Sequence, residues 1–101
     1  MTKAVTDFTV IRNEALNPVT HLIVLQSDGP LLSINPGQFV NAEIPGNKEV
    51  FLRRPFSVFE TDRRQNTLSL LVKILGKGSA TLARLRGGEK LNLVYPLGRG
   101  F

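Results

Sequence analysis

Two short segments of the sequence carry residue types that could bind a phosphorylated ligand. The first, residues 53–58, is Arg-Arg-Pro-Phe-Ser-Val. An arginine offers a planar fork that matches a phosphate, and a phenylalanine offers a flat face to an aromatic ring. On a strand, Arg54 and Phe56 share one face. Pro55 and Ser57 share the other, and a bulge at the proline would bring all four around one ligand. An edge strand with two solvated arginines and a core phenylalanine is the alternative.

The second segment follows an apolar run and consists of Gly76, Lys77, Gly78 and Ser79. Glycines let backbone N–H groups approach a ligand, and the unpaired N–H donors in the first turn of a helix favour anions. Lys77 adds positive charge, and Ser79 either caps the helix or bonds a phosphate oxygen. A tight strand-to-helix turn with an ordinary serine cap is the alternative. The segment is neither a Walker A nor a GxGxxG motif, because Ala-Thr-Leu-Ala follows it.

Composition excludes several other chemistries. The chain has no cysteine and one histidine, which excludes disulfides, thiolate nucleophiles and Cys-ligated zinc or iron–sulfur clusters within it. The net charge is +5, and the surplus is uneven: residues 1–50 have three basic and five acidic groups, whereas residues 51–101 have ten and three. The surplus of positive charge lies in residues 51–101, the half that contains both segments, and favours an anion-binding function there. A solvated basic face is the alternative.

The elements that must position these segments are mostly strands. The 101 residues allow one domain. Apolar and β-branched runs between turn signals predict strands over 5–11, 19–26, 38–44, 51–60, 67–75 and 90–95, the last ended by a proline. A short helix is predicted over Ser79–Arg86, with Ser79 as its N-cap. The pattern is typical of an all-β fold, a small antiparallel barrel or sandwich with one short helix. No apolar run approaches the roughly 20 residues of a membrane-spanning helix, and no signal peptide is visible.

Four motifs together carry a family resemblance. They are Pro-Gly-Gln-Phe-Val at 36–40, Leu-Arg-Arg-Pro-Phe-Ser at 52–57, Val-Lys-Ile-Leu-Gly-Lys-Gly-Ser at 72–79 and Pro-Leu-Gly-Arg-Gly-Phe at 96–101. In this order they resemble the flavin-binding barrel of the ferredoxin–NADP reductase superfamily. Within it, the chain is most similar to the electron-transfer subunits of NAD-dependent dihydroorotate dehydrogenases. The resemblance implies that residues 1–101 form a six-stranded Greek-key barrel that binds FAD.

The same resemblance implies which residues contact the FAD. They are Arg54, Pro55, Phe56, Ser57, Val72, Lys73, Ile74, Gly76, Lys77, Gly78 and Ser79. Arg54 and the 76–79 turn would hold the diphosphate, and residues 55–57 would line the isoalloxazine. Residues 72–74 would contact the flavin or ribityl chain largely through backbone. Many superfamily members have a tyrosine where Phe56 stands, so a phenol hydrogen bond is missing here while stacking survives.

The resemblance also implies partners outside this chain. In the family, electrons pass from an FMN-containing catalytic subunit through a [2Fe-2S] cluster and FAD to NAD⁺, in pyrimidine biosynthesis in the cytoplasm. We expect the NAD-binding domain and the cluster cysteines to lie beyond these residues, so the chain alone would be catalytically incomplete. No catalytic residue, resident metal, nucleic acid or membrane is expected. The alternatives are the FAD domain of another ferredoxin-reductase-like oxidoreductase subunit, and a barrel that binds single-stranded nucleic acid through phenylalanines among its arginines.

Overall fold

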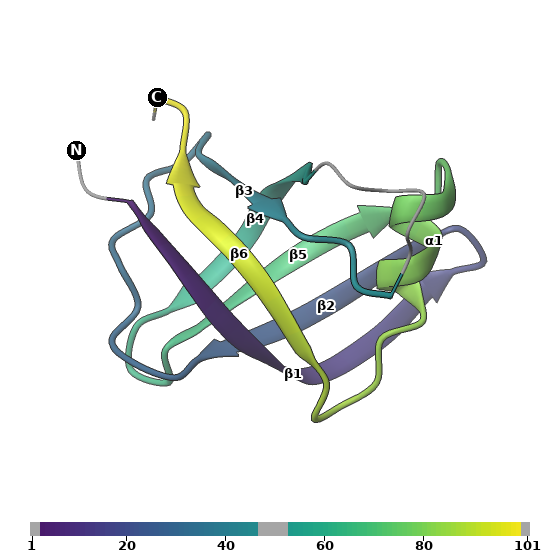
Figure 1. Cartoon of the computed structure of the whole chain (residues 1–101), viewed down its shortest axis with the longest axis horizontal. Helices are drawn as coiled ribbons and strands as arrows, with labels where there is room; N and C mark the ends of the chain where they lie inside the picture. The colour runs from purple at the N-terminus through teal and green to yellow at the C-terminus, as the bar shows by residue number, and fades with distance from the viewer. Residues whose placement is uncertain (1–2, 47–52, 100–101) are drawn as a thin grey trace.

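The strands of this protein close into an antiparallel barrel that carries one short helix (Figure 1). The computed structural model describes residues 3–46 and 53–99. Its elements are β1 (Ala4–Asn17), β2 (Thr20–Ser27), β3 (Phe39–Ala42), β4 (Arg54–Asp62), β5 (Thr67–Lys73), α1 (Lys77–Ala83) and β6 (Lys90–Leu97). The strand order around the barrel is β1-β2-β5-β4-β3-β6, in which β6 returns beside β3, as a Greek key requires. The expected six-stranded Greek-key barrel is therefore confirmed.

The alternation of apolar residues along the strands fills the inside of the barrel. On β5, Leu68, Leu70 and Val72 are at most 1% exposed, whereas Leu71 between them is 41% exposed. Inward and outward residues alternate because successive side chains on a strand point to opposite faces. This alternation fixes which residues of β5 are available to a ligand on the outer surface.

The helix differs from the predicted one at both ends. It spans Lys77–Ala83 rather than Ser79–Arg86, and Gly76 rather than Ser79 occupies the N-cap position. The Ser79 hydroxyl instead accepts hydrogen bonds from the N–H groups of Leu75 and Gly76, at 2.8 and 3.1 Å. The prediction that Ser79 is the N-cap residue is therefore wrong, because it is the third residue of the helix and its hydroxyl bonds back to the N–H of the N-cap residue Gly76.

A side chain on β1 holds the end of α1. The Asn13 amide nitrogen donates to the carbonyl oxygens of Ala83 and Leu85 at 3.1 and 2.9 Å. His21 Nδ1 donates to Asn13 Oδ1 at 2.7 Å, which orients the amide. The neighbouring residue Leu82 is fully buried in the core. The helix is thus fixed to β1 and β2 at one end, while its other end faces β4 and β5.

Several strand boundaries also differ from prediction. β1 continues to Asn17, well past residue 11, because it pairs with the whole of β2 through register shifts after Val10 and Ala15. β5 ends at Lys73, two residues early. β6 continues through Pro96 to Leu97, where its pairing with β3 is irregular and tolerates a residue without an N–H. Residues 51 and 52 of the predicted fourth strand lie outside the described residues.

The glycine-rich segment after β6 closes the barrel against β3. Gly98 has a φ of +79°, and a Cβ there would lie 2.8 Å from the ring of Phe39. The Gln38 side chain, 5% exposed, donates to the Gly98 carbonyl at 3.0 Å. These contacts explain the glycine at this position by packing and backbone conformation.

The only helix in the described part of the chain is too short to cross a membrane.

Candidate functional site

An outer groove forms where β4 and β5 separate. The two strands pair only between residues 58–62 of β4 and residues 67–70 of β5. Residues 54–57 pair with β3 alone, and residues 71–73 pair with β2 alone. α1 follows β5 after a link of residues 74–76, and the start of the helix borders the same groove. The separation of β4 from β5 therefore leaves a groove on the outer surface of the barrel.

The groove has a volume of about 690 Å³, which lies within the range of roughly 300–1,000 Å³ typical of small-ligand sites. It is lined by Arg54, Pro55, Phe56, Ser57, Leu71, Lys73, Leu75, Gly76, Lys77, Gly78 and Ser79. Nine of the eleven residues that the sequence predicts for the site are in this list. Segments about 20 residues apart in the sequence therefore come together around one hollow.

The two predicted residues that do not line the groove are Val72 and Ile74. The Val72 side chain is fully buried in the barrel, so only its backbone is available to a ligand. The Ile74 N–H donates to the Val19 carbonyl at 2.7 Å. In their place the groove presents Leu71 and Leu75, which are 41% and 82% exposed and which sequence analysis missed. Strict alternation from the buried Leu68 and Leu70 could have identified them.

Two cations of the groove have no protein partner within residues 3–46 and 53–99. Neither the Arg54 guanidinium nor the Lys73 ammonium makes a hydrogen bond or ion pair there. The stem of Arg54 lies against the helix start, since a Cβ at Gly78 would be 3.5 Å from Arg54 Cγ. Positive charge without a counter-charge at a concave surface favours an anionic ligand.

The remaining lining supplies apolar and hydroxyl groups. Phe56 is half-buried and packs against the core while it also borders the groove. Leu71 and Leu75 add exposed apolar surface, and the exposed Ser57 adds a hydroxyl. A ligand that suits this lining has a flat apolar part and an anionic part. The described residues contain no group of three or more side chains suited to a metal ion.

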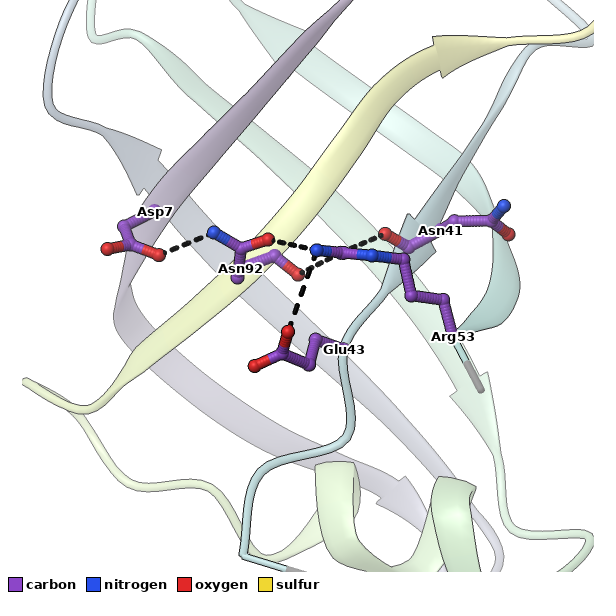
Figure 2. A network of polar contacts seen from close by, with 5 residues as sticks. All are labelled: Asp7, Asn41, Glu43, Arg53 and Asn92. Carbon is purple, nitrogen blue, oxygen red and sulfur yellow. Dashed lines mark hydrogen bonds and ion pairs between the residues drawn. The ribbon is translucent and has the colours of Figure 1, made fainter. Parts of the chain in front are cut away.

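Arg53 and Arg54 are adjacent in sequence but differ in their surroundings. Arg54 lines the groove, whereas Arg53 points to the opposite side of β3 and contacts Asn41, Glu43 and Asn92 (Figure 2). Sequence analysis assigned only Arg54 to the site, and the alternation of a strand places the adjacent Arg53 on the other face. The partners of Arg53 could not be predicted, because they lie on strands far away in the sequence.

Comparison with known proteins identifies the family of the chain. A family model described as "Oxidoreductase FAD-binding domain" matches residues 7–101. The chain is 34% identical over 95 residues to the dihydroorotate dehydrogenase B (NAD(+)) electron transfer subunit of Fusobacterium nucleatum, covering 94% of this chain and 37% of that protein. The protein of the same name from Enterococcus faecalis is 32% identical over 93 residues, covering 92% and 35%.

Solved structures share the fold. The ferredoxin reductase of carbazole 1,9a-dioxygenase superposes with a TM-score of 0.85 at 22% identity, covering 97% of this chain and 30% of that one. Phthalate dioxygenase reductase superposes with a TM-score of 0.80 at 16% identity, covering 95% and 30%. The chain spans about a third of the length of the curated relatives that it matches.

Proposed function

The chain belongs to the family of oxidoreductase FAD-binding domains, and from this premise we propose that its groove between β4, β5 and α1 binds FAD. The observation that carries the proposal is the convergence around one hollow of the ring of Phe56 with the cations of Arg54 and Lys73, which have no partner among the described residues. FAD combines a flat ring system with a diphosphate. The chemistry of the lining therefore fits the cofactor that defines the family.

Each group of the lining has a definite task in this proposal. Arg54 neutralises the diphosphate, and Lys73 and Lys77 add to the positive potential. Phe56, with Pro55 beside it, packs against the ring system. The Ser57 hydroxyl and the backbone of the 76–79 turn provide polar contacts. The Ser79 hydroxyl, which accepts from the N–H groups of Leu75 and Gly76, holds that turn in shape. When bound, FAD supplies the redox chemistry, and the protein orients it and excludes water from one side.

The larger assembly is the second part of the proposal. The two relatives above are named electron transfer subunits of dihydroorotate dehydrogenase B. We propose that this chain serves the same complex, with an FMN-containing catalytic subunit as partner, in the cytoplasm. The [2Fe-2S] cluster and NAD⁺ would then be bound outside the 101 residues, which contain no cysteine. Service in another ferredoxin-reductase-like oxidoreductase remains the alternative.

The nucleic-acid hypothesis is less well supported. It needs a row of available arginines, but Arg53 is engaged by Asn41, Glu43 and Asn92. Arg63 and Arg64 line a different hollow from Arg54. The family match across residues 7–101 also favours a flavin ligand.

A titration tests the proposed function. The purified chain is mixed with FAD, FMN or riboflavin, and binding is followed by the change in flavin fluorescence. FAD should bind most tightly, because only it has the diphosphate. Arg54→Ala should weaken FAD binding about tenfold or more, as expected for a lost hydrogen-bonded charge pair. Arg63→Ala, which removes an equal charge at a distance, is the matched control. Equal affinity for FAD and riboflavin, unaffected by Arg54→Ala, would contradict the proposal.

A further inference from the structure

The side chain of Arg53 connects three strands just before the groove-lining segment begins. Its Nη1 donates to the carbonyl oxygens of Asn92 and Asn41, at 3.2 and 3.3 Å. Its Nη2 donates to Asn92 Oδ1 at 2.5 Å and lies 3.6 Å from Glu43 Oε2. Figure 2 shows the guanidinium between these groups, with Asn41 on β3 and Asn92 on β6.

The network continues to β1 through the amide of Asn92. Asn92 Nδ2 donates to Asp7 Oδ1 at 2.8 Å, so the carboxylate fixes the orientation of the amide whose oxygen accepts from Arg53 (Figure 2). The Arg53 side chain is 27% exposed, and its partners include two backbone carbonyls that cannot move without moving their strands. Charge-assisted hydrogen bonds of this kind are stronger than neutral ones and are geometrically specific.

Among the described residues, the segment after Arg53 is paired with one strand only. Residues 54–57 pair with β3 on one side only, because β5 joins β4 from Val58 onward. Within that single pairing, Pro55 stands opposite Asn41 and has no N–H to donate. Arg53 donates to the carbonyl of that same Asn41 from its side chain. The Arg53 head group therefore adds a side-chain contact to β3 at the position where the strand pairing lacks the N–H of residue 55.

We propose that Arg53 positions the flavin site, and that it acts through Arg54 without touching the ligand. This inference rests on the proposed function. The guanidinium fixes residue 53 to β3 and β6, and the adjacent residue 54 must then direct its side chain to the groove. A planar fork with several donors is required, because the acceptors lie in different directions. A lysine, a point charge, can satisfy only part of this set.

The test compares variants of the chain by FAD titration. Arg53→Gln should weaken FAD binding about tenfold, within the range of coupling found between contacting residues, while Arg63→Gln should leave it within about twofold. Arg53→Lys should fall between Arg53→Gln and wild type. Asp7→Asn, at an exposed residue outside the groove, should weaken binding about two- to threefold because it only loosens the Asn92 amide. This mild variant keeps the test valid if Arg53→Gln does not fold.

A double-mutant comparison separates positioning from simple structural support. If Arg53 acts through Arg54, then Arg53→Gln should weaken FAD binding by only about twofold in a chain that already carries Arg54→Ala. If it merely supports the fold, its effect should be the same in both backgrounds, and the inference is wrong. The inference also fails if Arg53→Gln and Asp7→Asn both bind FAD as wild type does. Failure of the wild-type chain to bind FAD would instead overturn the proposed function.

Discussion

Replacing Asn13 tests how α1 is held against the barrel. Its amide nitrogen has two hydrogens, and the two shorter contacts are with the carbonyls of Ala83 at 3.1 Å and Leu85 at 2.9 Å. Asn13→Ala removes both bonds and leaves His21 Nδ1 without the oxygen that it contacts at 2.7 Å. A net hydrogen bond contributes about 0.5–1.5 kcal/mol, and an unsatisfied partly buried group adds to the loss. We therefore expect a loss of about 2–3 kcal/mol in the free energy of unfolding.

Thermal and urea unfolding, followed by circular dichroism, measure this loss. For a domain of this size 1 kcal/mol corresponds to about 4–8 °C, so the Tm should fall by roughly 10–20 °C. Asn13→Asp retains the acceptor for His21 but cannot donate to the helix carbonyls, so it should also destabilise the chain. Asn35→Ala, at an exposed asparagine, should change stability by less than about 0.5 kcal/mol. An Asn13→Ala chain as stable as Asn35→Ala would refute the reasoning.

Three further predictions concern the barrel and the groove. Gly98→Ala should lower the free energy of unfolding by about 1–3 kcal/mol, because the new Cβ would meet the Phe39 ring and φ is positive. Gly29→Ala, at a glycine with open space around it, is the control in the same urea titration. Tyr95→Phe should lower the free energy of unfolding by about 1–2 kcal/mol, since the Tyr95 hydroxyl accepts a hydrogen bond from the N–H of Leu32 at 3.1 Å. An unchanged urea midpoint would contradict this prediction. Lys73→Gln should weaken FAD binding about three- to tenfold at low salt, with a smaller difference at high salt; a salt-independent effect would argue against an electrostatic role.

Local patterns were sufficient to predict most of the fold. The β-branched and apolar runs between turn residues located six strands and one helix, and the family resemblance provided the Greek-key barrel, while the order of the strands around it came from the structure. The boundaries were less accurate, because they depend on partners far away in the sequence. β1 extends to Asn17 since β2 is long enough to pair with it. The helix begins at Lys77 since Ser79 bonds the loop behind it.

Most residues of the candidate site could also be predicted from the sequence, because they lie in two short runs of neighbouring residues. What escaped prediction depends on side-chain direction. Val72 faces the core and Leu71 the groove, a distinction that requires knowing which face of β5 is inside. Asn13 and Arg53 escaped for a different reason, because the contacts that define their roles are long-range. The helix carbonyls that accept from Asn13 lie 69 to 72 residues away, and the groups that accept hydrogen bonds from Arg53 lie 12 to 39 residues away.

Charge asymmetry indicated the half of the chain that lines the groove but could not identify the lining residues. Of the ten basic residues in 51–101, only Arg54, Lys73 and Lys77 line the groove. Arg53 is used to hold strands together, and Arg63 lies at a separate hollow. A cation is available to a ligand only if the fold leaves it without a protein partner beside a concave surface. Neighbouring arginines can therefore differ in their surroundings, since Arg54 lines the groove while Arg53 bonds β3 and β6, and the two roles that we propose for them follow from this difference.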